Sequence, residues 1–304
     1  MSTLKQRALH AAFRRYYARR LPEFTGGFPI VLDYPVQTSP RYPLGQRPHP
    51  RLARWFEERR AECEGALDLF ESYRAQLEAI PMTASDELDA MWRQPWFSFL
   101  DGMAAYAFVA SRRPRRIVEV GSGNSTKFMA RAIRDHGLQV ELTSIDPQPR
   151  AEIDRLCTHV RRQPFETVEP TSLGAIAPGD FVFIDNSHRA FTNSDVTAFF
   201  LDVLPELQPG VVVHIHDIFL PWDYPAEWSP RFYSEQYLLA AWLLANPERL
   251  RLLASNCFCS FDPELRDRVR ATWSSSPLAP LFAPGYPSHV EGVLGVSFWA
   301  EIAG

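Results

Sequence analysis

The segment RIVEVGSGNSTKFMARAI, residues 116–133, constrains the fold of this chain more than any other stretch. Residues 117–120 supply most of the β-branched run of a buried parallel strand. Gly121 and Gly123 then permit a sharp turn, and the residues that follow can form a helix. The segment therefore predicts a strand, a glycine turn and a helix in succession, which is a building unit of a parallel α/β sheet.

Glu119 is the unusual member of this strand, because a carboxylate in an apolar strand must find hydrogen-bond donors or face a ligand. In a loop that binds the pyrophosphate of a dinucleotide, its negative charge would oppose the ligand. A cationic or hydroxyl-rich ligand would be attracted to it. The segment therefore favours a sulfonium nucleoside over a dinucleotide, although a strand, turn and helix without a ligand is also compatible with it.

A second strand is predicted at residues 140–145, and it ends in Asp146 before Pro147 and Pro149. An acidic residue at this position can accept both ribose hydroxyls of a nucleoside that lies across the first turn. The alternative interpretation is a helix cap. Ribose binding is favoured because Asp146 occurs together with the glycine turn. A third, weaker strand is predicted around residues 159–162.

Two further apolar strands end in polar residues, one in DFVFIDNSH at 180–188 and one in VVVHIHD at 211–217. Between them, residues 195–204 have apolar side chains at helical spacing. Alternation of strand and helix is the pattern of a doubly wound sheet, whose ligand crevice lies at the carboxyl ends of the strands. The polar residues that we expect in that crevice are Asp185, Asn186, His188, His216 and Asp217.

The order Glu119, any residue, Gly121, any residue, Gly123 resembles the first motif of the class I S-adenosylmethionine-dependent methyltransferases. The chain departs from the commonest form of that motif at Ser125, where a third glycine often stands. Over about residues 95–220 it is similar to methyltransferase type 24 and to the metal-dependent small-molecule O-methyltransferases. The donor-binding residues that the resemblance implies are Glu119, Gly121, Ser122, Gly123, Asn124, Ser125, Asp146, Asp185 and Asn186.

The resemblance also implies an α/β fold with a Rossmann-like, doubly wound, seven-stranded sheet, mostly parallel with an antiparallel C-terminal hairpin. Helices are expected at 232–245 and 263–273, and strands near 249–254 and at 292–299. The last two strands would form the hairpin. S-adenosylmethionine is the implied methyl donor.

A divalent cation held by Asp185, His216 and Asp217 is a further implication of the resemblance. Carboxylates suit Mg²⁺ or Mn²⁺, whereas His216 shifts the choice toward Mn²⁺, Fe²⁺ or Zn²⁺. Similar sugar O-methyltransferases carry a histidine three residues after the fourth-strand aspartate, which makes His188 the candidate general base and leaves His216 as the second candidate. His214 lies deeper in its strand, where a buried structural role is favoured.

Residues 1–110 are expected to form an N-terminal helical extension with a proline-rich connector, and residues 111–304 the catalytic domain. Residues 1–22 are basic, lack acids and have roughly helical spacing, so a packed helix is favoured over a transit peptide or a surface-binding helix. Two helical stretches, about 50–80 and 85–111, precede the first strand. These helices are also a candidate surface for association of identical copies.

Composition excludes several other classes of protein. The 304 residues carry a formal net charge of -4, which gives no basic footprint for nucleic acid. Four cysteines form neither a disulfide framework nor a metal-binding motif. No apolar run reaches the ~18 residues of a membrane span, and no secretory signal is visible. We therefore expect a cytoplasmic protein, and the resemblance implies an enzyme of small-molecule biosynthesis.

The expected reaction is methyl transfer to the hydroxyl group of a small-molecule acceptor. Trp222 and Tyr224 follow the fifth strand and are candidates for a substrate lid, although a structural aromatic loop is equally compatible. One alternative is a metal-dependent hydroxylase or hydrolase that uses the histidines at the strand ends. It explains those histidines but leaves Glu119 and Asp146 without roles. A methyltransferase-like partner subunit without activity is the other alternative.

Overall fold

The computed structural model describes residues 38–169, 176–283 and 292–304, together with residues 12, 15, 172, 174 and 290. The chain divides into two compact units, Met1–Ser39 and Pro40–Gly304, and every element described below lies in the second unit. Most of the helix expected over residues 1–22 lies outside the described residues. The boundary expected between residues 110 and 111 stays a prediction.

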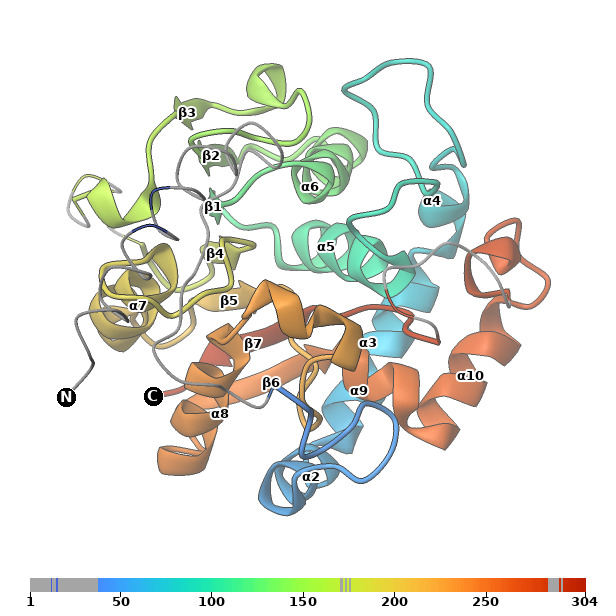
Figure 1. The fold of residues 1–304 in the computed structure, drawn as a ribbon. Helices are drawn as coiled ribbons and strands as arrows, with labels where there is room; N and C mark the ends of the chain where they lie inside the picture. Colours follow the sequence, from blue (N-terminus) through green and yellow to red (C-terminus); the bar gives the residue numbers. More distant parts are fainter. Residues whose placement is uncertain are drawn as a thin grey trace, which may run out of the picture. The chain divides into compact units, whose positions relative to one another are not determined.

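A seven-stranded sheet with the order β3-β2-β1-β4-β5-β7-β6 forms the centre of the second unit (Figure 1). The strands β1 to β5 pair in parallel, and β7 pairs antiparallel with both β5 and β6. The predicted Rossmann-like sheet with antiparallel C-terminal strands is therefore confirmed. The strands are β1 (Arg116–Val120), β2 (Glu141–Ile145), β3 (His159–Arg161), β4 (Phe181–Ile184), β5 (Val212–Ile215), β6 (Leu250–Ser255) and β7 (Phe298–Ile302).

Helices cover both faces of this sheet. Figure 1 shows α5 and α6 on one side and α7 and α8 on the other. The α-helices are α2 (Pro50–Glu57), α3 (Arg60–Ser72), α4 (Arg74–Glu78), α5 (Phe99–Arg112), α6 (Asn124–Asp135), α7 (Asp195–Ala198), α8 (Glu235–Ala245), α9 (Asn256–Phe261) and α10 (Pro263–Trp273). Among the described residues, no helix combines the length and apolar character that crossing a membrane requires.

Shorter helical turns complete the described part of the chain. The helix predicted at 195–204 starts as α7 and continues as a π-helix, Phe199–Val203, and a 3-10 turn, Leu204–Glu206. The other 3-10 turns are Asp154–Leu156, Phe165–Thr167, Ala226–Arg231 and Ala279–Phe282.

The helix predicted at 85–111 is wrong in its first half, because α5 begins only at Phe99. The side chain of Gln94 provides the reason. Its Oε1 accepts hydrogen bonds from the backbone N–H groups of Trp96 (2.8 Å) and Phe97 (2.9 Å). These bonds satisfy the amides in place of a helical turn, so the segment before α5 is a side-chain-stabilised loop.

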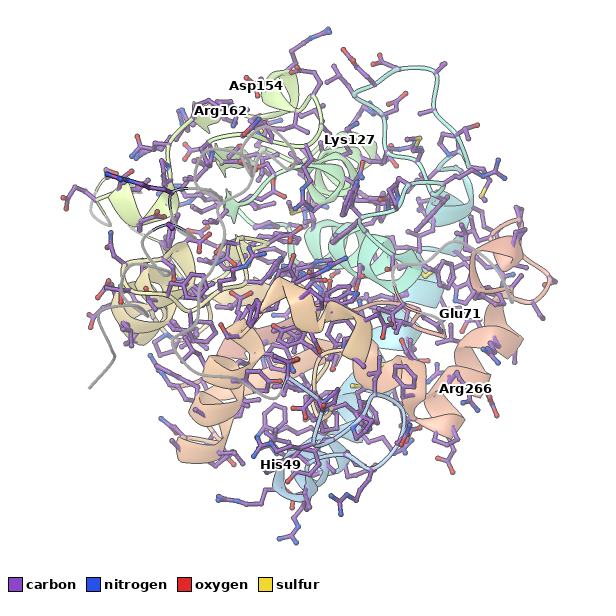
Figure 2. The ribbon with its side chains drawn as sticks, viewed as in Figure 1. His49, Glu71, Lys127, Asp154, Arg162 and Arg266 are labelled. Carbon is purple, nitrogen blue, oxygen red and sulfur yellow. The ribbon has the colours of Figure 1, made fainter. Side chains whose placement is uncertain are left out.

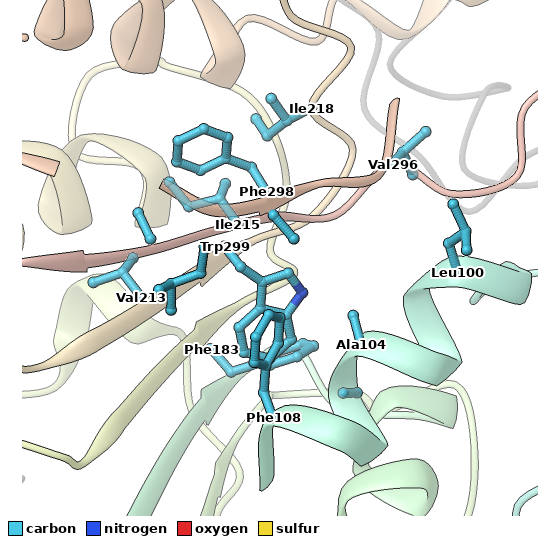
Figure 3. Close-up of a cluster of buried hydrophobic side chains, with 14 of the residues drawn as sticks. Leu100, Ala104, Phe108, Phe183, Val213, Ile215, Ile218, Val296, Phe298 and Trp299 are labelled. Atoms are coloured by element: carbon cyan, nitrogen blue, oxygen red, sulfur yellow. The ribbon is translucent and has the colours of Figure 1, made fainter. Parts of the chain in front are cut away.

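Large apolar side chains fill the space between the sheet and α5 (Figure 3). Trp299 of β7 is fully buried, and its ring centroid lies 5.0 Å from that of Phe108 on α5 and 5.7 Å from that of Phe183 on β4. His214 of β5 also belongs to this core, since its ring stacks on Phe183 at 3.6 Å and its Nε2 lies 2.9 Å from Ser297 Oγ. Burial lowers the pKa of His214 well below its usual value, in agreement with the structural role that the sequence favours.

Candidate active site

A cavity of about 430 Å³ opens at the carboxyl ends of β1, β2 and β4. Polar residues that the sequence analysis assigns to donor binding come together in its wall, as expected from the parallel strands. Those that line it are Gly121, Ser122, Gly123, Asn124, Ser125, Asp146, Asp185 and Asn186.

The two glycines of the turn have different structural roles. Gly121 has a φ of 78°, and a Cβ at this position would lie 1.7 Å from the backbone oxygen of Asp185. Any side chain there would therefore separate β1 from β4. Gly123 has an extended φ of 172°, and no atom lies within 4 Å of a Cβ built on it. Gly123 thus leaves open space at the cavity wall.

Asp146 is held at the edge of the cavity by backbone amides. Its Oδ2 accepts from the N–H of Ser122 and its Oδ1 from the N–H of Gln148, both at 2.8 Å. Arg162, which is paired with Asp154 (Figure 2), donates to the backbone oxygen of Asp146 at 3.1 Å. Carboxylate oxygens retain further acceptor capacity, so Asp146 could accept the hydroxyls of a ribose.

Glu119 is the one predicted donor-site residue that does not line the cavity. It is fully buried, and its carboxylate accepts hydrogen bonds from Ser125 Oγ and Thr126 Oγ1, both at 2.6 Å. Burial raises the pKa of Glu119 to about 8, although these two hydroxyls oppose the increase. Glu119 therefore supports the turn from beneath by joining β1 to the start of α6.

The lining of the cavity carries an excess of negative charge. Among the lining residues that the structure describes, Arg150 is the only arginine or lysine, and its guanidinium lies 4.6 Å from the ring centroid of Trp96. Such a lining suits a ligand with a positive charge. The lining carboxylates are Asp146, Glu166, Asp185 and Asp195.

Two imidazoles and two carboxylates meet where β4 and β5 end, and we call these four residues the imidazole–carboxylate cluster. His188 Nε2 lies 3.3 Å from both Asp185 Oδ1 and Asp217 Oδ2. His216 Nδ1 lies 3.5 Å from Asp185 Oδ1 and 3.4 Å from Asp217 Oδ1. Each imidazole thus faces both carboxylates.

The charges in this cluster stabilise one another. Burial alone would lower the pKa of His188 and His216, but the surrounding carboxylates raise both values well above the usual range. Burial raises the pKa of Asp185, yet the two imidazoles outweigh it and hold that pKa below its usual value. The carboxylates therefore favour the protonated form of both histidines, and a histidine must be neutral before it can act as a base.

Two buried carboxylates outside the cluster contact the outer nitrogens of the imidazoles. Glu235, the first residue of α8, has its Oε2 2.9 Å from His188 Nδ1. Asp101 of α5 has its Oδ2 3.5 Å from His216 Nε2. Neither residue was predicted from the sequence, because each resembles an ordinary acid in the first turn of a helix. The one signal for Asp101 is its position within a markedly apolar helix.

A second cavity of about 10 Å³ adjoins the cluster on the side of Asp217. Asp185 lines the large cavity, whereas His216 and Asp217 line the small one, so the cluster lies between the two. The other lining residues are Ser98, Phe219, Trp228, Val290, Val293 and Val296.

Trp222 and Tyr224, the expected lid residues, line neither of these cavities. Both side chains are buried. Trp222 Nε1 donates to the backbone oxygen of Gln46 at 3.1 Å, and Tyr224 Oη accepts from the N–H of Gln236 at 3.2 Å. In this conformation they hold the loop after β5 against the core.

The expected metal ligands Asp185, His216 and Asp217 do lie together in the cluster. Their polar atoms are directed at the facing imidazole or carboxylate. Within residues 38–169, 176–283 and 292–304, no group of three or more His, Cys, Asp or Glu side chains is arranged so that it could hold a metal ion. The divalent cation stays a prediction.

Comparison with known proteins gives one family match. Residues 118–218 match the model of a methyltransferase domain family, a range that runs from β1 to the loop after β5. No curated protein matches the sequence. The matched range includes the glycine turn, Asp146 and all four residues of the imidazole–carboxylate cluster.

Two solved structures are similar to parts of the chain. The SAH-bound methyltransferase PaMTH1 of Podospora anserina is 19% identical with a TM-score of 0.36, over 51% of this chain and 72% of that chain. A candidate methyltransferase from Thermobifida fusca YX is 12% identical with a TM-score of 0.36, over 68% of this chain and 84% of that chain. Because both scores are low, the fold assignment rests on the strand order itself.

Proposed function

We propose that this chain is a class I S-adenosylmethionine-dependent methyltransferase, which transfers the donor's methyl group to the hydroxyl group of a small molecule with His188 as general base. S-adenosylmethionine would occupy the 430 Å³ cavity, with its ribose at Asp146 and its backbone contacts at the glycine turn. The acidic lining supports this assignment, because the sulfonium and ammonium groups of the donor are cationic.

The position of Asp185 is the observation that carries the proposal. Its side chain lines the proposed donor cavity and also lies 3.3 Å from Nε2 of His188. Asp217, whose Oδ2 lies 3.3 Å from the same imidazole nitrogen, lines the small second cavity. A hydroxyl that entered from the side of Asp217 would therefore meet the imidazole beside the donor.

The chemistry is an in-line displacement. The acceptor oxygen forms a bond to the methyl carbon, the bond between carbon and sulfur breaks, and sulfur keeps the electron pair as a neutral thioether. The hydroxyl proton passes to Nε2 of His188, which must be neutral to accept it. Binding of a sulfonium cation near Asp185 adds positive charge beside His188 and favours that neutral form.

His188 is favoured over His216 as the base for two reasons. Its outer nitrogen makes a 2.9 Å hydrogen bond to Glu235, whereas His216 Nε2 has no hydrogen-bond partner of proper geometry among the described residues. His188 also adopts a left-handed backbone, with a φ of 60°, and Asp217 does the same at 54°. Such strain in non-glycine residues is common at functional sites.

Calorimetric titration with S-adenosylmethionine and S-adenosylhomocysteine tests the donor site. Binding that is lost in Asp146→Ala would support the proposal. The acceptor is then sought in a panel of small hydroxyl compounds by formation of S-adenosylhomocysteine. Absence of donor binding, together with tightly held iron or zinc in the purified protein, would instead favour the metal-dependent hydroxylase or hydrolase.

His188→Ala tests the base. It should lower turnover by roughly 10²–10⁴-fold and leave donor affinity nearly unchanged, because only proton transfer is removed. Loss of donor affinity in this variant would place His188 in the donor site and contradict its role as base. Assays with EDTA, followed by added Mg²⁺ or Mn²⁺, test the cation: turnover restored by the ion would support it, and equal turnover throughout would count against it.

A further inference from the structure

Glu235 is a buried carboxylate whose side chain makes one hydrogen bond within the described part of the chain. Its side chain is fully buried, and its Oε2 lies 2.9 Å from Nδ1 of His188. Its other oxygen, Oε1, has no hydrogen-bond partner among the described residues. Removing a carboxylate from water is strongly unfavourable unless other groups compensate for the lost hydration. Stability alone therefore gives no account of an acid at this position.

Two other buried carboxylates, Asp101 and Asp180, are different, because they accept hydrogen bonds from amide groups. Asp101 accepts from Asn256 Nδ2 and from the N–H of Ser297, both at 2.8 Å. Asp180, at the opposite end of β4 from the cluster, accepts from the N–H of Ala177 at 2.9 Å and that of Arg116 at 3.1 Å. These two acids hold loops in place, whereas Glu235 is directed at an imidazole.

The start of α8 fixes the backbone of His188 as well as its ring. The carbonyl oxygen of His188 accepts from the N–H of Ser234 at 2.8 Å and from that of Glu235 at 3.2 Å. The ring of Tyr233 lies 4.8 Å from the imidazole, between centroids. Three consecutive residues therefore constrain His188, and the carboxylate is the part that selects which ring nitrogen points outward.

We propose that Glu235 is a positioning residue that accepts the Nδ1–H of His188 and so keeps Nε2 directed at Asp185, Asp217 and the acceptor. The effect of Glu235 on turnover rests on the proposed function. The acceptor proton moves to Nε2 while the proton on Nδ1 stays in place, so no proton has to pass to Glu235. The carboxylate orients the ring and stabilises the imidazolium that forms, as in other carboxylate–imidazole pairs.

The kinetic test compares Glu235→Gln and Glu235→Asp with the natural protein. Glu235→Gln should lower kcat by about 10-fold or more, because an amide can present its N–H₂ to Nδ1 and favour the wrong tautomer. KM for donor and acceptor should change by no more than about twofold, and Glu235→Asp should recover part of kcat because it restores the charge. Asp180→Asn is the matched control: it should lower the melting temperature without lowering kcat.

A spectroscopic test needs no turnover. In proton NMR of the ligand-free protein, the Nδ1–H of His188 should give a strongly downfield resonance, because it donates to a buried carboxylate. His188→Gln identifies that resonance by removing it. The signal should disappear in Glu235→Gln and persist in Asp180→Asn.

The outcomes separate this proposal from the proposed function. Unchanged kcat in Glu235→Gln, alongside a large loss in His188→Ala, would overturn the role of Glu235 and leave the base intact. If no acceptor is methylated by the natural protein, the proposed function fails. The NMR result alone then decides whether Glu235 accepts the Nδ1–H of His188. If Glu235→Gln does not fold, Glu235→Asp is measured in its place, and full kcat with no downfield resonance in that variant would contradict the proposal.

Discussion

At Gly121 the backbone of Asp185, directly after β4, occupies the space that a side chain would need, whereas at Gly123 that space is empty. This contrast allows the fold and the ligand to be tested separately. Gly121→Ala should destabilise the protein by several kcal/mol, on the order of the steric and conformational penalties at such positions, because β1 and β4 must move apart. Urea denaturation checks this change.

Gly123→Ala should keep nearly natural stability and lower donor affinity by about tenfold or more, because its methyl group enters the space reserved for the donor. Calorimetric titration with S-adenosylhomocysteine measures the affinity. Equal donor affinity in Gly123→Ala and the natural protein would show that the donor does not approach this residue.

Protonation of the Glu119 carboxyl group affects the free energy of unfolding. Its folded-state pKa, about 8, is above the ordinary value of 4.5, so its contribution to stability is fully present below pH 4.5 and is lost as pH rises toward 8. Glu119→Gln cannot ionise. The difference in unfolding free energy between the natural protein and this variant should fall by on the order of a few kcal/mol between pH 5 and pH 8. A difference that is constant with pH would contradict the raised pKa.

The residues at strand ends could be predicted from sequence because each follows an apolar run directly. Asp146, Asp185, His216 and Asp217 all have this signal, and the structure brings them to one edge of the sheet. Glu235 could not be found in this way, since its partner lies 47 residues earlier in the chain and only tertiary packing joins them. Local pattern also gave no means to tell that hydroxyl groups at the start of α6 would donate to the carboxylate of Glu119.

At the scale of elements, the periodic segments were the predictable ones. Strands β1, β4 and β5 lie close to their expected positions because runs rich in β-branched and aromatic residues favour buried parallel strands. The expected strand at 292–299 begins only at Phe298, because the apolar residues before it pack as a loop. In that loop the N–H groups of Val296 and Ser297 donate to Asp101 of α5 rather than to a neighbouring strand.

Asp101 therefore joins α5 to the loop before β7. Asp101→Ala should lower the free energy of unfolding by roughly 3–5 kcal/mol, because it leaves buried N–H groups without their acceptor and removes the charge beside His216. Urea denaturation measures the change. Asp267→Ala, on the exposed side of α10, is the control and should alter stability little. Equal stability of the two variants would mean that the loop is held by packing alone.

At the scale of the whole molecule, residues Pro40–Gly304 form one compact unit, so a ligand bound at one edge of the sheet should stabilise all of it. At a free concentration 100 times its dissociation constant, S-adenosylhomocysteine should add about 2.7 kcal/mol and raise the melting temperature by about 5 °C. Differential scanning fluorimetry checks the shift. Asp146→Ala should lose it, and an equal shift in that variant would mean that the ligand binds elsewhere.

The interior position of β7 bears on how the protein is made. This strand lies between β5 and β6, although both precede it in the chain. During synthesis, β5 and β6 leave the ribosome before the strand that must separate them exists. Until residues 298–302 have been translated, each presents an unpaired backbone edge, which is a template for wrong pairing with other chains. The sheet can thus close only after all of its other strands have been translated.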